Sequence, residues 1–282
     1  MPERAPPPLG RRGLVLAGAL AAGVLAYSFL DLSLAGLVPR GGQSRILREF
    51  LAAALRPALD YEASFVPPGT PSFPRTVLAA VHRTLVFAAA ALSVSLPLGL
   101  VLGFCASSVW WSDDGGRPRR LAPLAQWSVR LAIAGMRSVH ELLWAVVFLA
   151  AFGLNTLSAV AAISIPFAGT LAKVFSEMLD EAPRNTAFAL RAAGASPLRV
   201  FLFGLVPRAL PDMAAYTFYR FECAVRSSAV LGFFGYETLG YYLKLSFDNL
   251  HYREVWTYLY VLFALVLAFE AWSGALRQRF VA

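Results

Sequence analysis

Six charged residues lie inside otherwise apolar stretches of this 282-residue sequence, and their types could do chemistry. They are Arg137, Glu141, Arg220, Glu222, Arg226 and Glu270. In a lipid bilayer a charged side chain costs on the order of 3 kcal/mol, so such residues pair or face a polar interior. Arg137 and Glu141 are spaced i, i+4, as are Glu222 and Arg226, and this spacing predicts ion pairs along one helix. Arg220 and Glu270 remain as partners between helices.

These charges have two interpretations. In the first, Arg137, Arg220 and Arg226 line a path for an anion, because their positive charge lowers the barrier to its entry. In the second, they belong to structural ion pairs near the membrane boundaries. From the sequence we favour the second interpretation, since a path that must release its solute has to bind it weakly.

The sequence contains no recognisable catalytic, cofactor-binding or metal-binding motif. His82, His140 and His251 are dispersed, and Cys105 and Cys223 lie in apolar stretches without neighbouring metal ligands. Such cysteines are typical of small buried hydrophobic residues. The phosphate-binding pattern GxxxxGK[ST] is also absent from the sequence. We therefore expect no catalytic, cofactor or metal site here, and we expect any ATP to be hydrolysed by another chain.

Composition places the chain in a membrane. Hydrophobic residues make up 58% of it, and its net charge is +8, carried almost wholly by arginine because only Lys173 and Lys244 are lysines. A basic excess in a membrane protein is typical of cytoplasmic loops that face anionic lipid headgroups. We therefore expect contact with membrane lipid and none with nucleic acid.

Apolar stretches long enough to cross a bilayer, about 20 residues each, predict about six transmembrane helices. The expected spans lie near residues 13–30, 84–112, 121–152, 157–178, 210–234 and 255–276. The second begins near Arg75, and "GLNT" (Gly153 to Thr156) separates the third from the fourth. We assign residues 1–74 to an N-terminal transmembrane anchor and an extracytoplasmic amphipathic segment. Residues 75–282 form an all-α integral membrane core with about five further spans.

Arginine placement in the short loops predicts that both termini are cytoplasmic. Under a six-span count, one side of the membrane holds Arg11, Arg12, Arg117, Arg119, Arg120, Arg184, Arg191, Arg199, Arg208, Arg277 and Arg279. The segment 31–74 lies on the other side. Within it, "SRILREFLAAALRPAL" (residues 44–59) has the apolar spacing of a helix that lies along the membrane surface.

The cytoplasmic segment around residues 179–208 predicts a helix-turn-helix. "EAPRNTAFALRAA" favours a helix, and Gly194 can take the left-handed conformation that ends it. Ser196 and Pro197 then supply a cap and the first position of a second helix. A compact protruding element of this kind suits docking against another protein, and an ordinary loop between two spans is the alternative.

The same segment resembles the coupling loop of permeases from ATP-binding-cassette (ABC) importers. Their signature is EAA, three residues, glycine, nine residues and I-x-L-P, and it fits with Gly194 as the glycine and Pro207 as the proline. Phe188 stands for the glutamate, Leu190 for the second alanine and Gly204 for the isoleucine, and Val206 replaces leucine. The implied coupling loop includes Ala189, Leu190, Arg191, Ala192, Ala193, Gly194, Ala195, Ser196, Pro197, Val206 and Pro207.

A wider resemblance, over approximately residues 75–280, is to the phosphonate-transport branch of these permeases. It is carried by "RSVHE" (residues 137–141), "ALRAAGAS" (residues 189–196) and the segment that begins "YRFE" (residues 219–232). The glycine-rich GxGGxG that commonly follows is "GYETLG" here. The resemblance implies a type I ABC importer permease fold with a cytoplasmic coupling helix, located in the bacterial inner membrane, and makes residues 75–282 the permease core.

The resemblance also implies a function and a set of partners. The chain would be the permease subunit of an ATP-driven importer that moves a phosphonate or a related phosphorus oxyanion by alternating access. Its partners would be two cytoplasmic ATPase subunits that bind ATP and Mg, an extracytoplasmic solute-binding protein, and a second copy of the permease. Closure of the ATPase dimer would move the loop around Gly194 as a rigid body.

Three other functions are less favoured. A permease for another small solute differs only in its substrate. An intramembrane enzyme that acts on anionic lipid would need a nucleophile and a base, and the sequence offers no such pair. A secondary transporter would normally show an internal repeat, which is not evident here.

Overall fold

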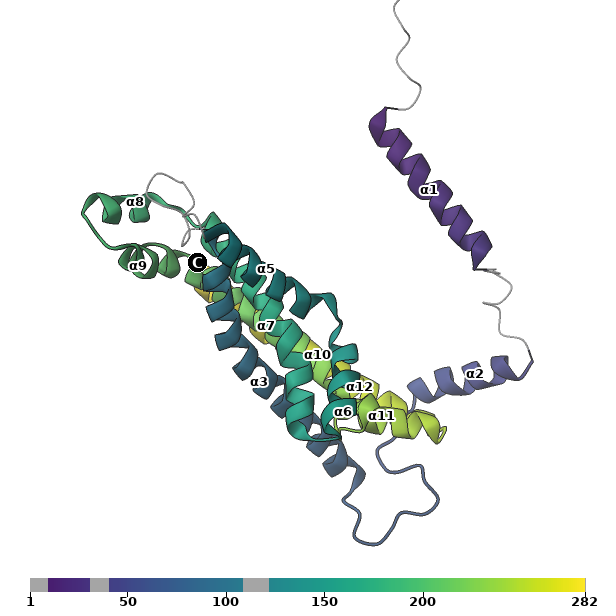
Figure 1. Cartoon of the computed structure of the whole chain (residues 1–282). Coiled ribbons are helices and arrows are strands. Elements are labelled where there is room, and N and C mark those ends of the chain that lie inside the picture. Colours follow the sequence, from purple (N-terminus) through teal and green to yellow (C-terminus); the bar gives the residue numbers. More distant parts are fainter. Residues whose placement is uncertain (1–9, 31–40, 109–121, 282) are drawn as a thin grey trace, which may run out of the picture. The chain divides into compact units, whose positions relative to one another are not determined.

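The structure is a computed structural model that describes residues 10–30, 41–108 and 122–281, and the described chain consists of helices without strands. It divides into two compact units, Met1–Ala52 and Ala53–Ala282. α1 (Arg11–Phe29) and most of α2 (Gly42–Ala54) belong to the first unit (Figure 1). The second unit contains α3 (Phe73–Ala106), α5 (Ala122–Ser138), α6 (Glu141–Phe152), α7 (Thr156–Glu181), α8 (Asn185–Ala192), α9 (Pro197–Val200), η2 (Phe201–Leu205), α10 (Val206–Val230), η3 (Leu231–Phe234), α11 (Leu239–Asp248) and α12 (Tyr252–Val281).

Each of the six predicted spans coincides with a helix or a pair of helices. Among the described residues, α3, α7 and α12 are long and apolar enough to cross a membrane, and the pair α5 and α6, bent by 87°, makes a fourth if it is one span. Gly13–Phe29 of α1 is a shorter apolar helix. α10 is 25 residues long and carries three of the six charged residues, so composition alone does not mark it as a span.

The first unit matches the helices that the sequence predicts there. α1 covers the first apolar run, and α2 covers most of the amphipathic stretch 44–59. Ile46, Leu47 and Leu51 of α2 are exposed, which is consistent with a surface helix. The loop with Arg117, Arg119 and Arg120 lies outside the described residues, as do the side chains of Arg11, Arg12, Arg277 and Arg279.

α7 is the central helix of the second unit, and it packs against α3, α5, α6 and α10. Small residues allow α3 to approach it closely, because a Cβ atom at Gly99 would lie 2.7 Å from the Cβ atom of Leu171. At Gly103 a Cβ atom would lie 3.0 Å from the carbonyl oxygen of Ala172. Close packing of small residues is a principal source of helix association in membranes, so this contact holds the core together.

Residues 53–72, which the sequence placed with the N-terminal segment, belong to the second unit and contact the start of α12. Two carboxylates form a reciprocal clamp. Glu62 accepts hydrogen bonds from the backbone N–H groups of Arg253 at 3.0 Å and Glu254 at 3.3 Å. The buried Glu254 accepts one from the backbone N–H of Glu62 at 2.7 Å and one from Ser246 Oγ at 2.7 Å. Glu62 thereby satisfies free N–H groups at the N-terminus of α12.

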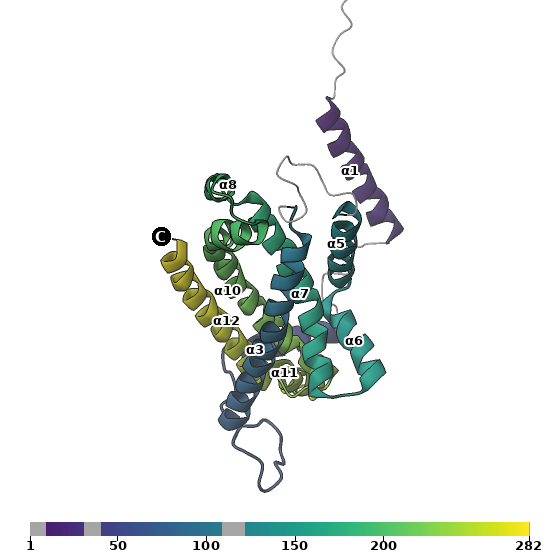
Figure 2. The same cartoon turned by 60° about the vertical axis from the view of Figure 1, so that its left-hand side comes forward.

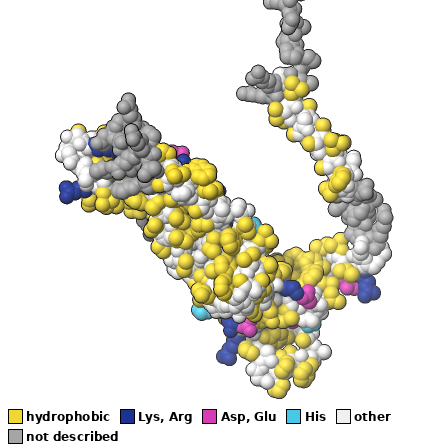
Figure 3. Space-filling model, viewed as in Figure 1, with side chains coloured by type: hydrophobic (Ala, Val, Ile, Leu, Met, Phe, Trp, Pro, Cys, Tyr) yellow, Lys and Arg dark blue, Asp and Glu magenta, His cyan; other side chains and the backbone are white. Residues whose placement is uncertain are grey.

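The second unit has two distinct ends. α8 and α9 protrude at one end, where α12 also finishes, and α11 lies at the other end with the loop that precedes α3 (Figures 1 and 2). Hydrophobic side chains cover most of the intervening face, and Lys and Arg side chains gather toward its ends (Figure 3). This distribution fits a body embedded in lipid with the α8–α9 segment outside it.

We predict that Gly99→Val destabilises the protein, because the added side chain must displace Leu171 and the backbone of α7. Overpacking of this kind costs about 1–3 kcal/mol, and thermal unfolding in detergent should show a lower Tm. Gly135→Val on α5 is the matched control, since a Cβ atom there meets nothing within 4 Å. Equal melting temperatures for the two variants would contradict the close α3–α7 contact.

Candidate functional site

One face of α10 lines two cavities in succession. Asp212, Tyr216 and Tyr219 contribute to the first, and Cys223 and Arg226 contribute to the second. Their spacing of three or four residues places them on a single stripe of the helix. The stripe starts near the protruding α8–α9 segment and runs into the charged part of α10.

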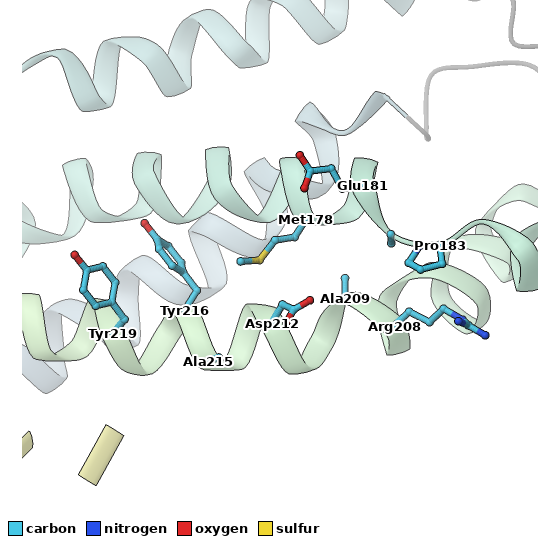
Figure 4. Close-up of a pocket in the computed structure, with 10 residues that line it drawn as sticks. Met178, Glu181, Pro183, Arg208, Ala209, Asp212, Ala215, Tyr216 and Tyr219 are labelled. Carbon is cyan, nitrogen blue, oxygen red and sulfur yellow. The ribbon is translucent and has the colours of Figure 1, made fainter. Parts of the chain in front are cut away.

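The first cavity lies between the end of α7 and the first half of α10, and its volume is about 680 Å³. Tyr216 and Tyr219 rise from α10 toward α7, and Met178 points back from α7 (Figure 4). The full lining is Met178, Glu181, Ala182, Pro183, Arg208, Ala209, Asp212, Ala215, Tyr216 and Tyr219. It is close to α8, α9 and η2 (residues 185–205), called the coupling segment after its predicted role, because Arg208 Nε donates to Thr186 Oγ1 of α8 at 3.0 Å.

The second cavity brings together four of the six charged residues singled out in the sequence. Its volume is about 410 Å³, and its lining includes Arg137, Glu141, Arg220 and Arg226. Arg137 lies in the last turn of α5, Glu141 begins α6 and the other two belong to α10, so three helices supply the charges and α7 completes the lining. Glu222 is buried on α10 and meets the cavity through its partner Arg226.

The two predicted i, i+4 ion pairs have different outcomes. Glu222 Oε1 accepts from Arg226 Nη2 at 3.0 Å, so this pair forms as predicted. Arg137 and Glu141 do not bridge, because the helix breaks between them with an 87° bend. Glu141 instead accepts from Ser227 Oγ at 2.8 Å and lies 3.5 Å from His140 Nε2.

Arg220 is held by an aromatic ring and not by an acid. Its guanidinium carbon lies 4.0 Å from the centre of the Phe167 ring, a cation–π contact. Its Nε atom is buried and has no hydrogen-bond partner. Glu270 is exposed on α12 and forms no ion pair with Arg220 in the part of the chain that the structure describes, so that suggested pairing is not present.

Arg137 also lines a third cavity of about 270 Å³ between α5 and α7. Lys173 and Glu177, which pair on α7, line it as well, together with Arg130. Gly169 of α7 allows α5 to pack closely at this point, because a Cβ atom there would lie 3.0 Å from Arg137 Cγ. Arg137 therefore stands where two cavities meet.

The coupling segment folds as the sequence predicts. α8 ends in a Schellman motif, in which Gly194 has φ 78° and the N–H groups of Ala195 and Gly194 donate to the carbonyls of Leu190 at 3.0 Å and Arg191 at 2.9 Å. Pro197 is the first residue of α9. η2 follows α9 and α10 follows η2 without an intervening loop. The segment is therefore joined stiffly to α10, the helix that lines the cavities.

The outer surface of this segment exposes several large apolar side chains as well as the basic Arg199. Phe188, which replaces the signature's glutamate, is 60% exposed, and Phe203 is 70% exposed. Leu198 and Leu202 are exposed beside them. Apolar side chains gathered on one protruding element are typical of a surface that binds another protein.

Two departures from the coupling signature compensate for each other. Gly204, in place of the isoleucine, is buried, and a Cβ atom there would lie 3.3 Å from both Leu190 Cδ1 and Ala187 Cα. Leu190, in place of the second alanine, therefore fills the volume that the missing side chain leaves. The signature has its larger side chain on the η2 side of this contact, whereas this chain has it on the α8 side.

Asp180 ties the ends of three helices together one turn before the coupling segment. It accepts hydrogen bonds from Ser107 Oγ at 2.7 Å and from the backbone N–H of Ser108 at 2.8 Å, both just after α3. Arg130 Nη2 on α5 lies 3.5 Å from its other oxygen. These contacts fix the end of α7, just before the coupling segment, against α3 and α5.

Sequence reasoning missed several of these residues. Phe167, Thr170 and Ser227 line the charged cavity, and nothing in their local sequence indicates contact with Arg220 or Glu141. The tyrosines of the first cavity had a usable signal, because Tyr216, Tyr219 and Cys223 repeat at helical spacing ahead of the charged residues. Asp180 had none.

Comparison with known proteins settles the family. Residues 95–281 match the model of the binding-protein-dependent transport system inner membrane component. The chain belongs to this family. It is therefore a transport permease of the bacterial inner membrane, and the coupling segment and the cavities lie within the matched residues.

Relatives of this permease agree in class. It is 32% identical over 197 residues to the phosphite transport system permease protein PtxC of Stutzerimonas stutzeri, covering 70% of this chain and 68% of that one. It is 28% identical over 225 residues to the phosphate-import permease protein PhnE of Mycolicibacterium smegmatis, covering 80% of this chain and 41% of the relative. The MetNI methionine ABC transporter in an inward-facing conformation shares the fold, with a TM-score of 0.63 at 19% identity over 74% of this permease and 99% of that chain.

We predict that Gly204→Ile and Leu190→Ala each destabilise the permease, by a clash and by a cavity respectively. The double variant should lose less than the sum of the two, because alanine makes room for part of the new side chain. Contacting residues show coupling of about 0.5–3 kcal/mol. Melting temperatures of the three variants in detergent measure this coupling, and strict additivity would show that the two sites do not compensate.

Proposed function

We propose that this chain is the permease subunit of an ATP-driven importer that moves a phosphorus oxyanion by alternating access. The observation that carries the proposal is the continuous connection from the coupling segment into α10, whose one face lines both main cavities. A displacement of α8 and α9 is thereby a displacement of the cavity wall.

The connection explains how force would reach the cavities. η2 passes directly into α10, and Arg208 on α10 holds Thr186 of α8. Asp180 holds the end of α7 against α3 and α5 close to the coupling segment. When an attached protein pulls on the segment, α10 therefore moves against a fixed set of neighbours. Rigid-body motion of this kind can open one end of the cavities and close the other.

Two copies of a cytoplasmic ATPase are the proposed partners of the coupling segment, and these ATPase subunits would bind ATP and Mg. Phe188 and Phe203 fit an apolar cleft on that partner. α12 finishes at the same end as α8 and α9, which supports a cytoplasmic C-terminus (Figure 1). A solute-binding protein would dock at the opposite end, and a second permease copy would complete the membrane part.

The substrate class follows from the relatives and the charges together. Relatives named for phosphite and phosphate transport handle small phosphorus oxyanions. A cavity that contains three arginines and one lining glutamate suits an anion better than a neutral or cationic solute. Another small anion remains the alternative that the uptake experiment separates.

The proposal is tested by uptake. The permease is reconstituted in liposomes with its ATPase, and phosphite, methylphosphonate, inorganic phosphate and sulfate are offered with the cognate binding protein. We expect ATP-dependent uptake of at least one phosphorus compound and none of sulfate. Uptake of sulfate alone would contradict the substrate class, and uptake without ATP would contradict the importer mechanism.

We predict that Gly194→Val lowers uptake while Gly194→Asn leaves it nearly unchanged. The native φ of 78° strains a β-branched residue by about 1–2 kcal/mol, and asparagine tolerates this conformation. A loss of that size corresponds to about 5- to 30-fold weaker engagement of the ATPase. Copurification of the ATPase and its hydrolysis rate are measured alongside uptake. Equal behaviour of both variants would remove the turn from the coupling role.

A further inference from the structure

We propose that Arg137 and Arg220 form a transient binding site for a phosphorus oxyanion inside the 410 Å³ cavity. This inference rests on the proposed function and gives the substrate a location. It also reverses the interpretation favoured by the sequence, in which both arginines belong to structural ion pairs.

The pairing pattern leaves these two cations available. Arg226 is bound by Glu222 at 3.0 Å, and Glu141 is engaged by Ser227 at 2.8 Å. Within the described residues, neither Arg137 nor Arg220 forms an ion pair. Two carboxylates thus balance two of three arginines, and the site retains about one net positive charge. Such a charge attracts an anion without trapping it, as transport requires.

The cation–π contact prepares Arg220 for an oxyanion. Phe167 covers the face of the guanidinium, whereas a phosphorus oxyanion binds to its N–H groups in the guanidinium plane. Stacking therefore fixes the plane and leaves the edge free. The Nε atom, which is buried and has no hydrogen-bond partner, is one donor on that edge.

A further donor group faces the same space. Arg137 comes from α5 on another wall of the cavity, whereas the hydroxyl groups of Ser227 and Thr170 in the lining already donate to Glu141 and to the carbonyl of Pro166. A tetrahedral oxyanion offers several acceptor oxygens, so it can engage two guanidinium groups from different helices at once. Because one group is on α10 and the other on α5, movement of α10 would separate them and release the anion.

Cys223 provides a reporter of occupancy because it lines the same cavity. The chain has one other cysteine, Cys105, so Cys105→Ser leaves a single thiol. The permease–ATPase complex in nanodiscs is treated with N-ethylmaleimide in the presence of phosphite, methylphosphonate or inorganic phosphate. We expect at least one of these to slow labelling of Cys223, and sodium chloride at equal ionic strength to have no such effect.

Variants of the two arginines provide the second readout. Arg220→Met and Arg137→Met should each abolish the protection of Cys223 and slow uptake about tenfold or more, the loss expected for a charge-assisted contact. Arg75→Met is the matched control, since Arg75 is exposed at the start of α3 and lines none of the three cavities. Copurification of the ATPase confirms that each variant assembles.

The outcomes separate the site from the function. If both arginine variants take up the phosphorus compound at the wild-type rate, the proposed site is wrong and the proposed importer function is unaffected, whether or not Cys223 is labelled. Protection by chloride equal to that by the phosphorus compounds also overturns it. Protection without uptake of any phosphorus compound supports the site and contradicts the proposed substrate. If the phosphorus compounds neither protect Cys223 nor are taken up, both the proposed site and the proposed substrate class are wrong.

Discussion

An arginine inside a lipid bilayer has to be compensated, and this constraint organises the charged part of α10. Arg226 is compensated by an acid one turn away, and Arg220 by the ring of Phe167. The ion pair and the cation–π contact have different effects on the charge of the arginine. An ion pair neutralises the charge, whereas a ring stabilises it and leaves it able to attract an anion. The electrostatic character of the cavity therefore depends on which partner each arginine has.

Close packing of the helices makes that arrangement rigid. Gly99 and Gly103 bring α3 against α7, and Gly169 brings α5 against a neighbouring side of α7. α7 in turn supplies Phe167 to the cavity. Because few of these contacts tolerate an added carbon atom, the wall formed by α3, α5 and α7 is a fixed frame. α10 is the cavity-lining helix that is directly continuous with the coupling segment.

Local patterns in the sequence were sufficient for the long apolar helices α3, α7 and α12, the "GLNT" break and the turn at Gly194. They were also sufficient for the Glu222–Arg226 pair, because i, i+4 geometry needs only a continuous helix. The Arg137–Glu141 pair met the same spacing rule and is absent, since the bend after Ser138 separates the two residues. Phe167 could not be found, because its contact with Arg220 joins positions 53 residues apart and depends on how α7 and α10 pack.

The compensation between Leu190 and Gly204 bears on how signatures are interpreted. Taken one at a time, each departure weakens the likeness to the coupling loop. In the structure Leu190 packs against Gly204, and a Cβ atom added at Gly204 would lie 3.3 Å from Leu190 Cδ1. Together the two residues preserve the volume of the α8–η2 contact. Phe188 has no such internal partner, because its side chain is largely exposed. If the proposed ATPase binds this segment, the same volume argument predicts an apolar pocket on the ATPase that receives Phe188.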